Sequence, residues 1–289
     1  MKMKKLILIA AAFLLLAPSP KAQAGKVVTD SLSSTALKSV VKYNVYLPDG
    51  YGKSDRKYPV VYLLHGLYGD YTDWLKRGTM KGVADELIAS GEAVPMVIVM
   101  PNAGAEDVHK VQNGYFNVKD WPYEDFFFGE FMPAVEAKYN CISDKGHRAV
   151  MGLSMGGGGS TVYAQRHPDL FSSCYAMSAW LDNKSDNVRR PHQPEDKLDI
   201  VCQSVMEHSA LDFIDNADEA TIGKLRTVKW FFDCGDDDYL LVLSEQLHQK
   251  MLRTRIKTEF RVRDGGHTWE YWHQALRLAL PFASRNFEK

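Results

Sequence analysis

The sequence lacks most of the features that assign a chain to a specialised class of protein. Its 289 residues include 35 lysines and arginines and 36 aspartates and glutamates, so the formal net charge is −1. Proteins that bind nucleic acid through their overall charge are basic, and this balance does not indicate such binding. The sequence also has no internal repeat and no low-complexity segment. We therefore expect an ordinary globular protein without a nucleic-acid partner.

Cysteine is scarce, and its spacing excludes a zinc motif. The four cysteines are Cys141, Cys174, Cys202 and Cys234. Zinc motifs bring cysteine or histidine pairs within a few residues, and these four positions are far apart. Cys174 and Cys234 lie in apolar runs, which favours buried thiols. Export would permit disulfides, but the sequence leaves the pairing of the four open.

Long apolar runs are absent after the first 24 residues. Before that point, three lysines within the first five residues precede an apolar run over residues 6–17 and the tripeptide Ala-Gln-Ala at 22–24. This is the pattern of a signal peptide with its cleavage site, and the run is short for a membrane span. A retained anchor is the alternative. We expect cleavage before Gly25 and a secreted or periplasmic protein with no membrane attachment in its mature form.

Strand-like and helix-like segments alternate along the rest of the chain. Strands are predicted at residues 26–34, 38–47, 58–64, 94–100, 148–153, 171–179, 228–233 and 258–263, and helices at 80–90, 125–139, 156–167, 240–253 and 269–283. The first two strands are expected to form an antiparallel edge. The alternation predicts one α/β domain over residues 25–289, with a mostly parallel sheet and helices on both faces.

Two stretches between these elements are candidates for shaping a binding site. Residues 180–227 are long and initially polar, with short helices predicted at 200–207 and 217–225, and we interpret them as a cap-like excursion beside the active site. The loop over residues 103–122 contains four side chains that either line a pocket or pack on the surface. They are Asn113, Tyr115, Phe116 and Trp121.

Gly152-Leu-Ser154-Met-Gly156 has the G-x-S-x-G pattern of a nucleophile elbow. An apolar strand is predicted before it and a helix of small residues after it. Such a strained turn exposes the serine hydroxyl, and the two glycines remove side chains that would collide as strand and helix approach. The helix N-terminus supplies unpaired N–H groups where negative charge develops. A simple glycine-rich turn is the alternative interpretation.

A second glycine-containing loop follows the strand predicted at 58–64. It reads His65-Gly-Leu67-Tyr-Gly69 and lies where an α/β sheet places its ligands. In α/β-hydrolases this loop donates one N–H group of the oxyanion hole, and we expect Leu67 to be that donor. We interpret His65 as a buried residue that shapes the loop without transferring a proton.

Ser154, the Asp236–Asp238 cluster and His267 each follow a predicted strand and precede a helix. The carboxyl ends of parallel strands share one edge of the sheet, so these residues can meet. Their order, serine then acid then histidine, is that of α/β-hydrolases. A serine hydroxyl needs a base, histidine titrates near neutrality, and a carboxylate fixes the imidazole tautomer. The alternatives are a helix cap at Asp238 and a surface loop residue at His267.

Four stretches of the sequence carry a family resemblance that spans roughly residues 40–281. They are Tyr58-Pro-Val-Val-Tyr-Leu-Leu-His-Gly66, Gly152-Leu-Ser-Met-Gly-Gly157, Cys234-Gly-Asp-Asp-Asp-Tyr-Leu240 and Gly266-His-Thr-Trp-Glu-Tyr-Trp272. In these the chain resembles the putative esterase family of α/β-hydrolases, which includes S-formylglutathione hydrolases, tributyrin esterases, feruloyl and acetyl xylan esterases of carbohydrate esterase family 1, and mycolyltransferases. The elbow reads GLSMGG where S-formylglutathione hydrolases usually have GHSMGG, which is closer to the feruloyl and tributyrin esterases.

The resemblance implies that Ser154 is the nucleophile, Asp238 the acid and His267 the base. It further implies that Leu67 and Met155 supply the oxyanion-hole N–H groups. No metal or cofactor is needed for this chemistry.

We expect an exported serine carboxylesterase that acts on small-molecule or polysaccharide-linked esters, with feruloyl or acetyl esters of plant polysaccharide as first choice. The alternatives are a mycolyltransferase-like acyltransferase to a sugar hydroxyl, a peptidase, and a non-catalytic carbohydrate-binding protein on this scaffold. The acyl group, the alcohol and the oligomeric state remain open.

Overall fold

The computed structural model describes residues 24–104, 107–184 and 196–289. The predicted signal peptide, residues 1–24, lies outside the described residues except for Ala24. The same holds for residues 185–195, which belong to the predicted cap-like excursion. Within the described ranges, no helix is long and apolar enough to cross a membrane.

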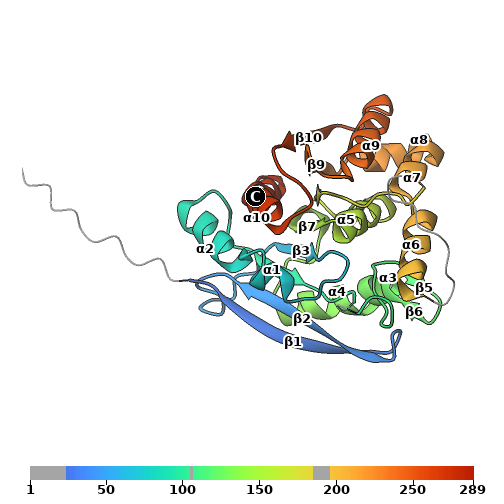
Figure 1. Ribbon diagram of the computed structural model, residues 1–289. Coiled ribbons are helices and arrows are strands. Elements are labelled where there is room, and N and C mark those ends of the chain that lie inside the picture. Colours follow the sequence, from blue (N-terminus) through green and yellow to red (C-terminus); the bar gives the residue numbers. More distant parts are fainter. Residues whose placement is uncertain (1–23, 105–106, 185–195) are drawn as a thin grey trace, which may run out of the picture.

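The centre of the molecule is an eight-stranded sheet with the strand order β1-β2-β4-β3-β7-β8-β9-β10 (Figure 1). The strands are β1 (Lys26–Ser34), β2 (Ser39–Leu47), β3 (Val60–Leu64), β4 (Val97–Met100), β7 (Arg148–Leu153), β8 (Ser173–Met177), β9 (Lys229–Gly235) and β10 (Thr258–Arg263). The pairs β1–β2 and β2–β4 are antiparallel, and every other neighbouring pair is parallel. The predicted mostly parallel sheet with an antiparallel edge is therefore confirmed.

Helices cover both faces of this sheet. They are α1 (Asp73–Lys76), α2 (Met80–Ser90), α3 (Tyr123–Phe126), the π-helical turn η1 (Phe127–Phe131), α4 (Met132–Lys138), the 3₁₀ turn η2 (Lys145–His147), α5 (Met155–Arg166), α6 (Lys197–Glu207), α7 (Ala210–Asn216), α8 (Glu219–Leu225), α9 (Leu241–Arg253) and α10 (Trp269–Asn286). A two-stranded hairpin, β5 (Asn117–Val118) and β6 (Trp121–Pro122), lies in the loop before α3. The α/β-hydrolase arrangement predicted from the sequence is the one observed.

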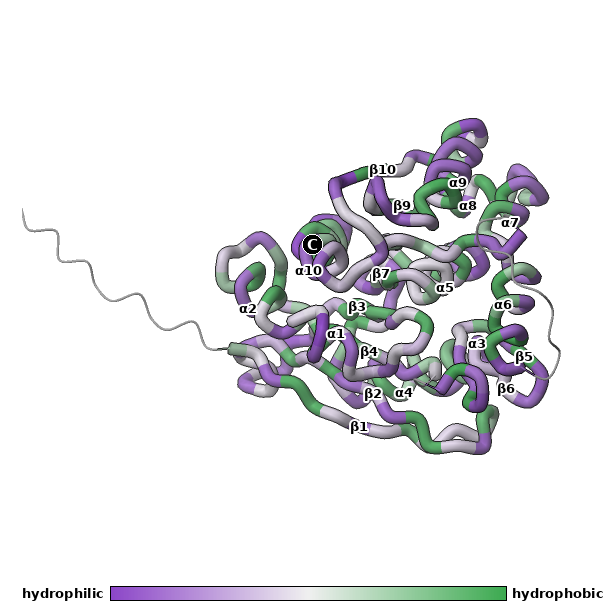
Figure 2. Tube along the Cα trace, in the orientation of Figure 1, coloured by the Kyte–Doolittle hydropathy of each residue, from purple (hydrophilic) through white to green (hydrophobic). Residues whose placement is uncertain are grey.

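Alternation along the central strands divides the core into two halves. Within β3, Tyr62 and Leu64 pack into the cluster that contains α4, α5 and α9, whereas Val61 and Leu63 pack into the cluster that contains α2 and α10. Successive strand residues point to opposite faces, so a strand covered on both sides reads as a continuous apolar run. Along α9, by contrast, hydrophobic and hydrophilic residues are interspersed at helical spacing (Figure 2), because only one face of this helix meets the sheet.

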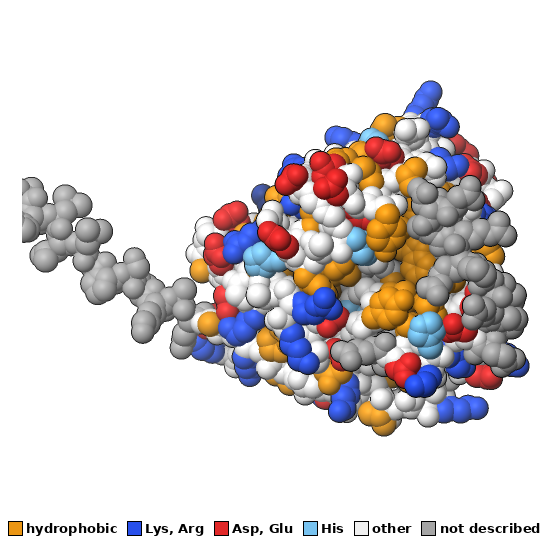
Figure 3. Space-filling model, in the orientation of Figure 1, with side chains coloured by type: hydrophobic (Ala, Val, Ile, Leu, Met, Phe, Trp, Pro, Cys, Tyr) orange, Lys and Arg blue, Asp and Glu red, His pale blue; other side chains and the backbone are white. Residues whose placement is uncertain are grey.

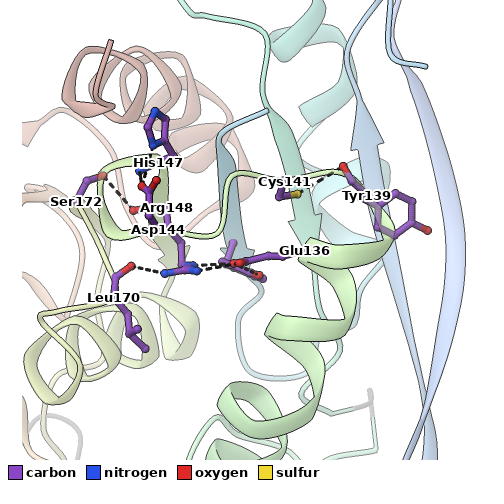
Figure 4. A network of polar contacts seen from close by, with 9 residues as sticks. Glu136, Tyr139, Cys141, Asp144, His147, Arg148, Leu170 and Ser172 are labelled. Atoms are coloured by element: carbon purple, nitrogen blue, oxygen red, sulfur yellow. Dashed lines mark hydrogen bonds and ion pairs between the residues drawn. The ribbon is translucent and has the colours of Figure 1, made fainter. Parts of the chain in front are cut away.

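A buried ion pair anchors the first residue of β7 (Figure 4). The Arg148 guanidinium donates through Nε and an Nη atom to both oxygens of Glu136, at 2.6 and 2.8 Å, and through the other Nη atom to the Leu170 carbonyl oxygen at 2.8 Å. Tyr62 donates its hydroxyl to the same carboxylate at 2.9 Å. The pair therefore ties β7 to α4, to β3 and to the turn before β8.

The stretch between β8 and β9 forms α6, α7 and α8, of which the sequence predicted α6 and α8 but not α7. Asp196, Ser209 and Asp218 cap the N-termini of the three helices by accepting backbone N–H groups. In Figure 1 these helices lie along one side of the molecule, next to α5 and α9. Their buried residues join the core cluster on that face of the sheet, so the excursion packs on the domain.

Candidate active site

Ser154 occupies the sharp turn between β7 and α5, where its φ of 53° and ψ of −118° are unusual for a residue with a side chain. A Cβ atom on Gly152 would lie 2.5 Å from the Gly156 carbonyl oxygen, and one on Gly156 would lie 2.5 Å from the His65 carbonyl oxygen. Only glycine fits at these two positions. The strained turn and the flanking glycines match the predicted nucleophile elbow, with Ser154 8% exposed at the edge of the sheet.

Ser154, His267 and Asp238 form one hydrogen-bonded chain. The Nε2 atom of His267 lies 2.9 Å from the Ser154 Oγ atom. Its Nδ1 atom lies 2.9 and 3.1 Å from the two carboxylate oxygens of Asp238. Since an ionised carboxylate only accepts hydrogen bonds, Nδ1 carries the proton and Nε2 faces the serine as an acceptor. The loops after β7, β9 and β10 thus bring together the three residues predicted to act as a triad.

The three consecutive aspartates after β9 have different surroundings. Asp238 is 4% exposed and is the aspartate that contacts His267. Asp236 is exposed and accepts the Gly265 backbone N–H at 3.0 Å, which ties the β9 and β10 loops together. Asp237 is exposed to solvent. Of the three, Asp238 therefore has the geometry required of the acid.

Asp238 is held in its charged form by its contacts. Burial alone would raise the pKa of this carboxyl, but hydrogen bonds and attraction from His267, the Leu240 backbone N–H and the Ser178 hydroxyl lower it below its usual value. Ser178 itself accepts the indole N–H of Trp272 at 3.0 Å. The Trp272 ring meets the His267 ring edge to face, with centroids 4.8 Å apart. These contacts fix both the acid and the histidine.

Of the two predicted oxyanion-hole donors, Met155 directly follows Ser154 at the start of α5, and Leu67 lines the same cavity as the serine. Both are backbone N–H groups at the start of a turn or helix, and within the described ranges neither donates to a protein acceptor. His65 is 1% exposed, and its Nε2 atom accepts the Ala103 backbone N–H at 2.9 Å. Burial lowers the pKa of His65 to about 4. A neutral, fully engaged imidazole agrees with the structural role predicted for this residue.

The serine opens into a cavity of about 630 Å³. One part of its wall is apolar and comes from the excursion and the start of α9, with Trp180, Leu198, Cys202 and Leu240. Another part combines polar and aromatic side chains that the sequence did not identify as site residues. These are Tyr68, Asp73, Arg77, Tyr239, Thr268, Trp269 and Trp272. Tyr68 and Tyr239 directly follow Leu67 and Asp238, and this adjacency was the signal available in the sequence.

The four side chains of the 103–122 loop that were candidates for the pocket do not line this cavity. Tyr115 is 1% exposed and donates its hydroxyl to the His65 carbonyl oxygen at 2.9 Å. Phe116 stacks on His208 with ring centroids 4.4 Å apart. These two aromatic side chains belong to the core cluster that also contains buried residues of α5 and α6. They therefore do not line the cavity at Ser154, and surface packing does not describe the buried Tyr115.

All four cysteine side chains are buried, and Cys141, Cys174 and Cys234 are free thiols. Burial raises the pKa of Cys174 and Cys234 above the usual range of a thiol. The sequence-based expectation of buried thiols at these two positions is therefore confirmed. Their raised pKa values make them poor nucleophiles.

A family model described as putative esterase matches residues 34–283. A bifunctional endo-1,4-beta-xylanase/feruloyl esterase of Xylanibacter ruminicola is 35% identical over 132 residues, which are 44% of this chain and 18% of that protein. Esterase Rv1288 of Mycobacterium tuberculosis is 34% identical over 136 residues, or 47% of this chain and 28% of that protein. The chain thus matches less than a third of the length of either curated relative.

Solved structures extend the similarity over the whole domain. The structure of a ferulic acid esterase is 48% identical, with a TM-score of 0.88, and the match covers 92% of this chain and 99% of that one. A fluorophosphonate-binding serine hydrolase of Staphylococcus aureus shares the fold at 21% identity, with a TM-score of 0.73 over 91% and 99% of the two chains. With most of its length matched by the family model, the protein belongs to the putative esterase family.

Proposed function

We propose that the protein is an exported serine carboxylesterase that hydrolyses feruloyl esters linked to plant polysaccharide. The observation that carries the reaction type is the Ser154–His267–Asp238 chain of contacts beside an open cavity. The similarity to a ferulic acid esterase along nearly the entire domain supports the acyl group. Export rests on the signal-peptide pattern at residues 1–24.

The mechanism follows from the positions of these groups. His267 Nε2 accepts the Ser154 hydroxyl proton while Oγ attacks the ester carbonyl carbon. The Leu67 and Met155 N–H groups stabilise the negative oxygen of the tetrahedral intermediate. The intermediate collapses when His267 gives its proton to the leaving alcohol, and the acyl group stays on Ser154. A water molecule, deprotonated by the same histidine, then releases the acid and restores the serine.

The apolar part of the cavity supports an aromatic acyl group. Trp180, Leu198 and Leu240 offer flat and branched apolar surface, and the cavity of about 630 Å³ has room for a phenylpropenoyl group. An acetyl group would leave this wall uncovered by the substrate. Within the family, feruloyl hydrolysis therefore fits this site better than acetyl hydrolysis.

A panel of esters tests the proposal. Methyl ferulate, methyl p-coumarate, 4-nitrophenyl acetate and acetylated xylan are hydrolysed by the same preparation, and kcat/KM is measured for each. We expect methyl ferulate to exceed the acetyl substrates. A preference for acetyl esters, or no hydrolysis of either hydroxycinnamate, would contradict the proposed substrate class.

Product analysis with added sugar acceptors separates hydrolysis from acyl transfer. We expect free ferulic acid as the main product even with arabinose or trehalose in excess. A feruloylated sugar as the main product would identify an acyltransferase instead.

A further inference from the structure

The leaving alcohol of the ester must lie beside His267, because this residue gives it a proton. The imidazole Nε2 atom lies 2.9 Å from Ser154 Oγ, and Tyr239 packs against the same imidazole with ring centroids 4.8 Å apart. Tyr239 is nevertheless 56% exposed. The Tyr239 ring thus presents an open aromatic surface next to the position of the alcohol.

Tyr68 provides a second exposed ring at the same opening. It is 50% exposed, lines the same cavity and directly follows the predicted oxyanion donor Leu67. Its φ of 64° lies in the left-handed region, which a residue with a large side chain adopts only when its surroundings impose it. Tyr68 and Tyr239 both line this cavity. Burial, and after it the Asp238 charge and the Tyr68 phenol, raise the pKa of Tyr239.

A negatively and a positively charged side chain line the same cavity as these two rings. Asp73 and Arg77 belong to α1 and the turn after it, and the Arg77 guanidinium lies 5.1 Å above the centre of the Trp269 ring. Among the described residues, neither the Tyr68 nor the Tyr239 hydroxyl has a hydrogen-bond partner. This part of the wall therefore offers flat apolar faces together with unused donors and acceptors and no excess of charge.

We propose that Tyr68 and Tyr239 form a subsite for the sugar ring that carries the ester. The inference rests on the proposed function and adds to it the residues that recognise the alcohol. A sugar ring has C–H faces that pack on aromatic rings and hydroxyls that bond to phenol, carboxylate and guanidinium groups. A lipid alcohol would need a continuous apolar wall, whereas the lining of this cavity also includes the charged side chains of Asp73 and Arg77. Figure 3 shows hydrophobic side chains gathered on this face of the molecule, between the places of α10 and α6 in Figure 1.

The test compares two substrates with the same acyl group, methyl ferulate and a feruloylated arabinoxylo-oligosaccharide. For Tyr68→Ala and for Tyr239→Ala, we expect the ratio of kcat/KM for the oligosaccharide to that for methyl ferulate to fall about 3- to 10-fold, as for the loss of an aromatic contact. The ratio cancels any damage to His267 that affects both substrates. Tyr239→Phe keeps the ring and should retain most of the ratio.

Leu252→Ala is the matched control, because Leu252 is an exposed apolar residue of α9 that does not line the cavity. Its ratio should equal that of the wild type. Thermal unfolding of each variant checks that the fold is intact. If the ratio stays within about twofold of the wild type in both alanine variants, the loss is below that of one aromatic contact and the subsite is wrong.

A second measurement does not depend on the feruloyl group. An arabinoxylo-oligosaccharide without ester should inhibit the hydrolysis of 4-nitrophenyl acetate by the wild type, and less so for Tyr239→Ala. If the wild type hydrolyses no feruloyl ester but is inhibited in this way, the proposed acyl group is wrong and the sugar subsite stands. If the oligosaccharide does not inhibit at its highest soluble concentration, the sugar subsite is overturned.

Discussion

Arg148 opens strand β7 and Ser154 directly follows its last residue, and the surroundings of the two residues differ in nearly every respect. Arg148 has an ordinary extended backbone and a guanidinium fully engaged with Glu136 and the Leu170 carbonyl. Ser154 has a strained backbone and faces an open cavity. Six steps from residue to residue along the strand separate them, or about 20 Å. In this strand, the amino end is held by satisfied polar contacts, and the strained, reactive residue lies at the carboxyl end, where α/β sheets place their ligands.

If this comparison is right, the largest effect on activity comes from the serine itself. Ser154→Ala removes the nucleophile and should lower kcat on methyl ferulate on the order of 10⁴-fold or more, with little change in thermal stability. A fluorophosphonate probe followed by peptide mass spectrometry should label Ser154 in the wild type. Labelling of another residue, or near-normal activity of the variant, would contradict the assignment.

The acid should matter almost as much, and its two neighbours far less. Asp238→Asn leaves the geometry intact but favours the wrong imidazole tautomer, so kcat should fall by about 10⁴ at neutral pH. Asp236→Asn and Asp237→Asn are matched controls, because their side chains do not contact His267. If Asp238→Asn keeps a near-normal kcat while either control loses most of its kcat, the acid of the triad is the aspartate changed in that control.

Substitutions at the amino end of β7 should have the opposite effect, lowering stability and leaving activity nearly unchanged. Glu136→Gln leaves the buried Arg148 charge without its carboxylate, which should lower the free energy of unfolding by about 3–5 kcal/mol. The activity of the molecules that remain folded should be near normal, measured at a temperature well below the transition. The double variant Glu136→Leu/Arg148→Met removes both charges and should be much less destabilised. A large loss of kcat in the folded single variant would show that the two ends are coupled.

His65 combines features of both regions, because it is buried like the Glu136–Arg148 pair but supports the loop beside Ser154. Its pKa is lowered from 6.5 to about 4, so the folded state holds a neutral imidazole where the unfolded state takes up a proton. This contribution to stability is complete above pH 6.5 and declines as the pH falls towards 4. Since a tenfold change in proton affinity corresponds to about 1.4 kcal/mol, the fall of the pKa from 6.5 to about 4 limits the loss to about 3.5 kcal/mol.

Urea unfolding between pH 7 and pH 4 measures this dependence. The variant His65→Gln keeps an acceptor for the Ala103 N–H but does not titrate. Its stability should therefore fall less steeply with decreasing pH than that of the wild type. Equal slopes for the two proteins would contradict the role of His65.

The smallest expected effect concerns substrate selectivity at α6. Leu198→Ala enlarges the apolar part of the cavity and should lower kcat/KM for methyl ferulate relative to 4-nitrophenyl acetate by about tenfold. Val205→Ala is the control, because Val205 is a buried residue of the same helix that does not line the cavity. If both variants change the ratio equally, the effect comes from destabilising α6 and the cap does not select the acyl group.

The sequence alone predicted most of the fold and the chemistry of the site. The strand at Arg148–Leu153 and the helix at Met80–Ser90 have the predicted bounds, because buried apolar runs and helical periodicity depend on local sequence. The convergence of Ser154, Asp238 and His267 could also be deduced. Each follows a strand, and parallel strands end at a common edge whatever the length of the chain between them.

Other features were decided only by the tertiary structure. That Tyr68 and Tyr239 line one cavity depends on how the loops after β3 and β9 pack, and no periodicity in the sequence of either loop indicates it. Helix α7 was missed, because it is a short segment of seven residues whose stability comes from packing within the core. The local sequence pattern thus determined the strands and the reactive residues that follow them. The shape of the cavity, and with it the choice of substrate, was determined by contacts between residues distant in the sequence, which a single sequence does not encode in any periodic form.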